Sequence, residues 1–141
     1  MSATGLDVFD RTLQISNIWL DDVMEGMFWS DRHKAYHAMR AVLHALRDRL
    51  PVNENAHLAA QFPMLIRGMF FEGWHPAKTP VKERSRDEFL VHVSEAFLFD
   101  TEAEAGQIAT AVFAVLSEHI SEGEVEKIKK VLPEGIRELW P

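Results

Sequence analysis

Apolar residues recur every three or four positions along most of the chain, a period that is typical of amphipathic helices. The first such stripe comprises Phe9, Leu13, Leu20, Val23 and Met27. A second stripe runs over residues 35–50, where Pro51 stops the helix. Further helices are expected at about 53–62 and from Pro63 to near Gly73. No segment alternates apolar and polar residues as a strand does, so the pattern predicts an all-α fold.

The helical pattern occurs twice in the chain. Shifted by 70 positions, residues 17–70 align without a gap on residues 87–140, and 11 of the aligned pairs are identical. The identical pairs include Pro63 with Pro133 and Arg67 with Arg137. We therefore predict an internal duplication, with two pseudo-symmetric helical repeats joined by a linker at 71–86. The repeats are expected to pack as one bundle-like domain over residues 1–141.

Polar residues mark the expected starts of several helices. Thr4 is expected to precede the first helix, and Ser30 the second. In the second repeat, a hydroxyl residue three positions before a glutamate predicts capping boxes at Ser85–Glu88, Thr101–Glu104 and Ser121–Glu124. Because the linker combines two prolines with no apolar period, we expect it to be extended.

Composition limits the chemistry that the chain can perform. The sequence has no cysteine, which excludes disulfides, iron–sulfur clusters, thiolate zinc sites and thiol catalysis. It begins without a basic segment followed by an apolar run, and no stretch approaches 18 uninterrupted apolar residues. We therefore expect a cytoplasmic protein with neither a secretory signal nor a membrane span.

The negative charge is concentrated in the second repeat. The whole chain has a net charge of −7, of which the second repeat contributes −8 and the first repeat nothing. The linker is basic through Lys78, Lys82, Arg84 and Arg86, but four charges in an acidic protein make a thin nucleic-acid footprint. Nucleic acid is thus an unlikely partner, and the acidic half is expected mainly to keep the protein soluble.

Three segments resemble a known bacterial family. They are LPVNENAHLAAQFPMLIRGMFFEGWHP at 50–76, the P-x-K-x-R pattern at 80–84, and ISEGEVEKIKKVLPEGIRELWP at 120–141. Together they are similar to the family called domain of unknown function 2267. The resemblance implies a small, helical, uncharacterised bacterial protein with no assigned activity, cofactor or catalytic residue.

Two histidine patterns have metal-ligand spacing. His33 and His37 stand four positions apart on one expected helix face, and Glu54 with His57 forms an E-x-x-H motif. A di-iron site needs a second such motif, but Lys127 occupies the equivalent position in the other repeat. Because isolated patterns of this kind often occur by chance, the sequence assigns no metal, no cofactor and no catalytic residue.

Methionine and aromatic residues gather in the first repeat and in the residues that follow it. Met69, Phe70, Phe71 and Trp74 could form an adaptable apolar surface for a partner, although ordinary core has the same composition and is the favoured interpretation. Trp74 and Trp140 each follow a short helix behind a proline. We expect both rings to be largely buried and residues 78–84 to be exposed.

A glutamate and an arginine recur in both repeats. Glu54 lies 13 residues before Arg67, and Glu124 lies 13 residues before Arg137. The proline between them should turn the short last helix back toward its predecessor. We therefore predict a structural ion pair in each repeat, which would fix the angle between the two helices.

These patterns favour a non-enzymatic helical binding or interaction module, with an unknown protein partner or small ligand and a possible homodimer. The alternative is a metal- or small-molecule-dependent enzyme with its site between the repeats. An enzyme should have a cleft with convergent polar groups and shifted pKa values, which a binding module would lack. A third hypothesis is nucleic-acid binding through the basic linker.

Overall fold

The chain folds into helices, most of them joined by short loops, and this computed structural model describes residues 2–98, 100 and 103–141. The α-helices are α1 (Asp7–Met27), α2 (Arg32–Arg47), α3 (Val52–Ala59), α4 (Met64–Phe71), α5 (Arg86–Ser94), α6 (Ala105–His119), α7 (Glu122–Val131) and α8 (Glu134–Arg137). Two short 3-10 helices, η1 (Pro76–Lys78) and η2 (Glu95–Phe97), follow α4 and α5. The described ranges contain no strand, which confirms the all-α prediction.

The helix starts in the second half follow the predicted signals. Ser85 and Glu88 form a capping box, because the Ser85 hydroxyl accepts the Glu88 amide and the Glu88 carboxylate accepts the Ser85 amide. Ser121 accepts the amide of Glu124 at 3.2 Å at the start of α7. The box predicted at Thr101–Glu104 lies partly outside the described residues.

The first two helices begin later than the sequence predicted. Leu6 precedes α1 without a side-chain cap, while Thr4 stays outside the helix and donates its amide and hydroxyl to Asp10. At α2 the cap is Asp31 and not Ser30. The Asp31 carboxylate accepts two first-turn amides, at 3.0 and 3.2 Å, and its charge suits the positive end of the helix.

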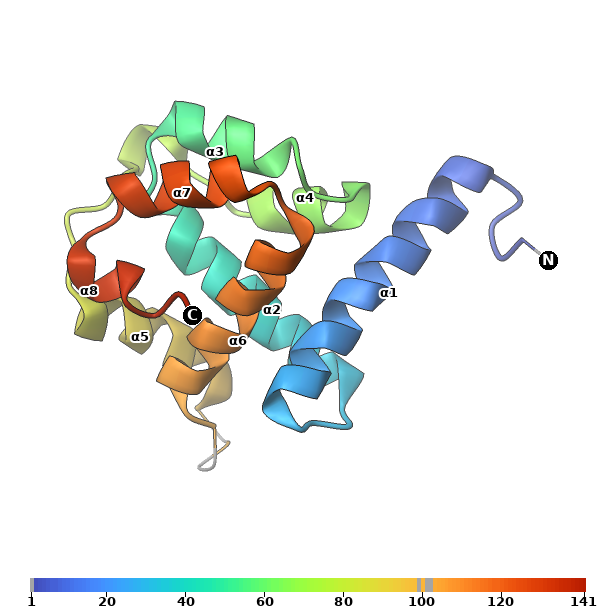
Figure 1. Ribbon diagram of the computed structural model, residues 1–141, viewed down its shortest axis with the longest axis horizontal. Coiled ribbons are helices and arrows are strands. Elements are labelled where there is room, and N and C mark those ends of the chain that lie inside the picture. The colour runs from blue at the N-terminus through green and yellow to red at the C-terminus, as the bar shows by residue number, and fades with distance from the viewer. Residues whose placement is uncertain (1, 99, 101–102) are drawn as a thin grey trace.

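The centre of the molecule is formed by α2, α5 and α6, and the second half of α1 packs against α2 and α6. In Figure 1, α3 and α7 lie side by side along one edge of this centre, and α4 and α8 follow them in the chain. One hydrophobic core draws its side chains from both halves of the chain, from Trp19 through to Trp140. The two halves are therefore in direct contact.

Two pairs of helices from the two halves begin at positions 70 residues apart. α3 and α7 begin at residues 52 and 122, and α4 and α8 begin at 64 and 134, so both pairs keep the 70-residue offset of the sequence repeat. Pro63 and Pro133 immediately precede α4 and α8. Of the two short helices α4 and α8, α8 is the shorter, because it ends at Arg137 while α4 continues to Phe71.

Arg67 and Arg137 make the same backbone contacts in the two halves. In each, Nε and Nη2 donate to two carbonyls at the end of the preceding helix. The acceptors are Ala59 and Phe62, both at 2.9 Å, for Arg67, and Lys129 and Leu132, at 2.9 and 3.0 Å, for Arg137. Carbonyls at a helix C-terminus lack helical partners, so each guanidinium caps the helix before it.

This capping differs from the predicted ion pairs with Glu54 and Glu124. Glu54 lies in the first turn of α3, whereas Arg67 reaches the other end of that helix. The nearest cation to Glu54 is Lys127 of α7, whose Nζ lies 3.8 Å from Oε2. The arginines still join each short helix to its predecessor, but they do so through backbone carbonyls and not through the glutamates.

The two tryptophans that follow the short helices differ in burial. Trp140 is only 6% exposed, its ring stacks on Phe113 with centroids 4.2 Å apart, and its Nε1 donates to the Ser117 hydroxyl at 2.6 Å. Trp74 is half-buried against Phe71. The predicted burial is therefore confirmed for Trp140 and only partial for Trp74, while most of residues 78–84 are exposed as expected.

The first half of α1 projects from this body. Figure 1 shows α1 running away from the other helices toward the N-terminus, so that only its second half lies against the centre. We refer to residues 6–18 as the arm. Inside the arm, only Thr12 and Ser16 are buried.

Candidate functional site

The arm turns hydroxyl groups inward and apolar side chains outward. Thr12 and Ser16 are 8% and 6% exposed, and the Thr12 hydroxyl accepts the amide of Leu65 at the start of α4 at 3.1 Å. The outward apolar side chains, between 36% and 54% exposed, are Leu6, Val8, Phe9, Leu13, Ile15 and Ile18. An ordinary surface helix has the opposite arrangement, so this exposed apolar surface is the most unusual feature of the molecule.

Helical spacing divides these apolar residues into two strips on either side of the inward face. The first strip consists of Leu6, Phe9 and Leu13, which recur at three and four positions. The second strip consists of Val8, Ile15 and Ile18. Between the strips, on the side away from the body, the arm carries polar residues: Asp7, Asp10, Gln14 and Asn17.

A groove lies beside the first strip, between α1 and α4. It encloses about 440 Å³, and its apolar wall includes Leu13, Leu20, Tyr36, Met64 and Leu65. Met64 and Leu65 are 48% and 47% exposed, so α4 extends the apolar surface beyond the arm. The first strip and the groove therefore form one continuous apolar surface on the same side of the molecule.

Charged residues flank this surface with opposite signs. Arg11 lies on the arm within the second strip, is exposed, and forms no ion pair with the residues that the structure describes. Glu72 lines the groove and accepts two hydrogen bonds from Arg40, at 3.2 and 2.6 Å, which lower the pKa of its carboxyl. The second strip thus carries a positive charge that is unpaired among the described residues, and the groove carries a carboxylate that is paired with Arg40.

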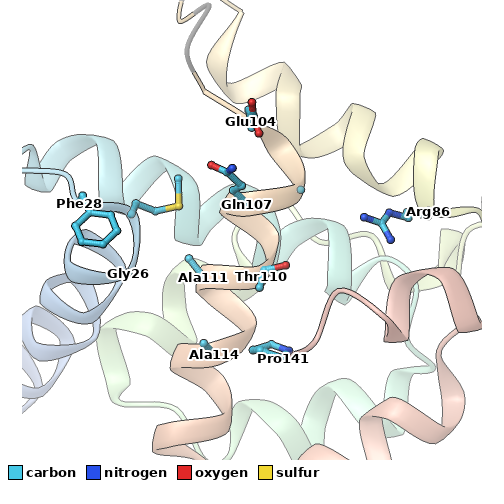
Figure 2. A pocket seen from close by; sticks show the side chains of 11 residues that line it. Gly26, Phe28, Arg86, Glu104, Gln107, Thr110, Ala111, Ala114 and Pro141 are labelled. Carbon is cyan, nitrogen blue, oxygen red and sulfur yellow. The ribbon is translucent and has the colours of Figure 1, made fainter.

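A second cavity, of about 770 Å³, lies between the end of α1 and α6, where the predicted enzyme would have its site. Figure 2 shows its polar side chains Glu104, Gln107 and Thr110 spread along α6, with Arg86 set apart on α5. Glycine and alanine provide much of the remaining wall. In most catalytic clefts the polar groups converge on one point, but the polar groups of this cavity do not.

The groups with shifted pKa values lie outside this cavity. Burial lowers the pKa of His44, and a hydrogen bond with His92 lowers the pKa of the Glu83 carboxyl. His44 lies on α2, Glu83 in the linker, and Glu72 directly after α4. None of them lines the cavity, where a catalytic acid or base would have to lie.

His33 and His37 are adjacent, as their spacing predicted. Their Nε2 atoms lie 3.0 Å apart, and the rings meet edge to face with centroids 4.4 Å apart. The nearby Asp31 carboxylate already accepts two amides at the start of α2. Two histidines on one exposed turn offer a metal only two ligands, fewer than zinc sites in proteins have.

Glu54 and His57 face a lysine of the other half. Lys127 Nζ lies 2.9 Å from His57 Nδ1 and 3.8 Å from Glu54 Oε2. An ammonium group therefore occupies the position where a metal bound by the E-x-x-H motif would need to lie. This contact between α3 and α7 is extended by Gln61, which bonds to both the hydroxyl and the amide of Ser121.

The predicted surface of Met69, Phe70, Phe71 and Trp74 is mostly interior. Phe70 is fully buried, Met69 is 8% exposed, and Phe71 packs against the core. Phe71 and Trp74 are both half-buried, so neither presents a fully exposed ring to a partner. The exposed apolar surface lies instead on the arm and at the start of α4.

Sequence reasoning missed the arm because it assigned Phe9 and Leu13 to a buried stripe. Both residues are exposed, at 48% and 36%. The alignment of residues 17–70 on 87–140 contained the relevant signal, since it begins at residue 17 and leaves the arm with no aligned segment in the second half.

Comparison with known proteins gives a family match over most of the chain. The family described as "Uncharacterized conserved protein (DUF2267)" matches residues 16–139, so the match begins near the inner end of the arm. A search of the curated proteins gave no match. Among the described residues, no helix is long and apolar enough to cross a membrane.

Proposed function

This chain belongs to the DUF2267 family of uncharacterized conserved proteins, and on that premise we propose that it is a non-enzymatic interaction module that binds a second copy of itself through the arm. The observation that carries the proposal is the reversed polarity of the arm. Hydroxyl groups face the body while two apolar strips face solvent. Covering such strips in an interface stabilises the assembly by the hydrophobic effect.

The partner that best fits the arm is another arm. Each copy carries both an apolar strip and an apolar groove, so two copies related by a twofold axis can insert the second strip of each into the groove of the other. Val8, Ile15 and Ile18 would then meet Met64 and Leu65 of the second copy. This arrangement also brings Arg11 of one copy toward Glu72 of the other, so that opposite charges meet.

We also infer that the body of the module arose by duplication and that its halves are related by a pseudo-twofold axis. Support comes from the constant offset of α3 to α7 and α4 to α8, and from the equivalent capping by Arg67 and Arg137. In this interpretation the family region supplies the paired repeats as one domain, and the arm is an added element that serves association.

The alternative function, an enzyme with its site between the repeats, has weaker support in the cavity between α1 and α6. Its polar side chains are dispersed, and small residues form much of its wall. A helix-binding or structural role suits such a surface better than acid–base chemistry, which requires convergent groups near one reacting atom.

Replacing Val8 and Ile18 by aspartate is expected to convert a dimer of the full chain into a monomer. Both side chains are about half exposed, at 54% and 49%, so the double variant should fold like the wild type. In a dimer, however, it would bury two unpaired carboxylates in each copy. Sedimentation velocity at several protein concentrations measures the change directly, and circular dichroism confirms the fold.

The matched control is Val91→Asp. Val91 is 55% exposed on α5, away from the arm, and its substitution should leave the dimer intact. Met64→Asp, at the opposite side of the proposed contact, should dissociate the dimer as the arm variant does. Self-association that survives both the arm and the groove variants would contradict this interface.

A further inference from the structure

A histidine and two carboxylates from different halves of the chain meet beside the buried Trp19. Asp22 comes from α1, and Glu118 and His119 come from the end of α6. One potential ligand atom of each residue lies within 4.8 Å of those of the other two. His119 Nε2 is 2.5 Å from Asp22 Oδ2, and both side chains are about one fifth exposed, so water and ions can reach them.

The ring of His119 is held in a fixed orientation. It stacks on the indole of Trp19, with centroids 5.1 Å apart and planes 17° from parallel. Trp19 is itself only 2% exposed and packs edge-on against Phe62. A histidine ligand whose orientation is set by its surroundings loses less entropy on binding a metal than a freely rotating one.

The equivalent position in the other half holds a permanent cation. The register of the duplication places Phe89 opposite Trp19 and Arg49 opposite His119. The Arg49 guanidinium lies over the Phe89 ring, 5.3 Å from its centroid, and its Nη2 is 3.7 Å from Glu83 Oε2. In that half, therefore, a buried positive charge lies between an aromatic ring and a carboxylate.

The Trp19 side has the carboxylates but lacks the permanent cation. Among the described residues, neither Asp22 nor Glu118 forms an ion pair with a lysine or arginine, and the only cationic partner available to Asp22 is His119. Two carboxylates and one imidazole give a net negative site whenever the imidazole is neutral. An added divalent cation would balance this charge, as Arg49 balances Glu83 in the other half.

We propose that Asp22, Glu118 and His119 bind a divalent first-row metal ion that joins α1 to α6. A set of one imidazole and two carboxylate donors suits zinc, which commonly takes three protein ligands and a water. Bond lengths of about 2.0–2.2 Å to zinc require the imidazole nitrogen and the Asp22 oxygen to separate to roughly 3 Å when the metal replaces the proton between them. The ion would fix the base of the arm to the second half of the chain.

Zinc titration of the metal-free full chain tests this site. Isothermal titration calorimetry in a non-chelating buffer should give one zinc ion per chain bound at the cluster. The variants His119→Gln and Glu118→Gln should each weaken zinc binding at least about tenfold, since each removes a ligand. Glu118 is exposed, so its substitution leaves the packing intact and keeps the test valid if His119→Gln lowers the stability of the fold. Cobalt provides a spectroscopic readout, because its visible absorption band should disappear in His119→Gln.

The control is the double variant His33→Ala/His37→Ala, which removes the exposed histidine pair on α2. It should retain the zinc affinity of the wild type. Zinc binding that is lost in this control but kept in His119→Gln and Glu118→Gln would overturn the proposal and assign the ion to the histidine pair. Absence of stoichiometric zinc binding to the wild-type chain would also overturn it, and would leave His119 as a hydrogen-bond partner of Asp22. Neither result bears on self-association, which is measured independently.

Discussion

Replacement of Trp140 by alanine is expected to lower the free energy of unfolding by about 3–5 kcal/mol. The side chain is 6% exposed, stacks on Phe113, and donates its indole N–H to the Ser117 hydroxyl at 2.6 Å. Truncation removes this buried area, leaves a cavity against α6, and deprives Ser117 of its donor. Chemical denaturation followed by circular dichroism measures the loss.

Trp74→Ala is the matched control for this prediction. Trp74 also follows a short helix behind a proline, but it is only half-buried and its Nε1 has no hydrogen-bond partner among the described residues. Its replacement should therefore cost clearly less than that of Trp140. Equal losses of unfolding free energy in Trp74→Ala and Trp140→Ala would contradict this prediction, because they would show that the deeper burial of Trp140 adds no stability.

Replacement of Arg47 by methionine should cost about 3 kcal/mol, because it leaves buried acceptors without donors. Arg47 is 5% exposed on α2, and its Nη1 donates to the carbonyls of Phe70 and Glu72, both at 2.9 Å. These two bonds tie the end of α4 to the centre of the molecule. Methionine retains most of the side-chain volume, so the measured loss reports the hydrogen bonds more than the packing.

Arg40→Met is the corresponding control on the same helix. Arg40 joins α2 to Glu72 through an ion pair at 2.6 Å, yet both side chains are well exposed, at 39% and 62%. Exposed ion pairs contribute little to stability, so this variant should unfold nearly as the wild type does. A loss at Arg40 as large as that at Arg47 would show that the surface pair holds α4 in place.

The helices themselves were predictable because local chemistry determines where they stop and start. Pro51, Pro63 and Pro133 cannot continue a helix, and each directly precedes a helix in the structure. Ser85 caps α5 as its spacing to Glu88 indicated. These signals act over a few residues, so a single sequence contains all the information needed to interpret them.

The partners of charged side chains were less predictable, since they depend on distances between helices. Recurrence of Glu54 and Arg67 at one spacing suggested an ion pair, but the arginine caps the helix end nearest to it. Burial of Thr12 and Ser16 was also unexpected, because helical period alone favoured Phe9 and Leu13 for the inward face. The Leu65 amide donates a hydrogen bond to the Thr12 hydroxyl, so the side of the arm that carries the hydroxyl groups faces α4.

The cluster of Asp22, Glu118 and His119 was also not predictable from local sequence. Its members come from helices that are far apart in the sequence, and no short motif joins them. The predicted 70-residue register could have indicated the position, because it aligns His119 with Arg49. Only the fold shows that both residues stack on equivalent aromatic rings.

Hydrogen–deuterium exchange of the wild-type chain at low and high protein concentration tests the proposed self-association most directly. The amides of residues 7–18 should exchange quickly in dilute solution, because the arm has few contacts with the body. At high concentration the same amides, and those at the start of α4, should become protected while α6 is unchanged. If the amides of the arm exchange at the same rate at both protein concentrations, the proposal that a second copy covers the arm is contradicted.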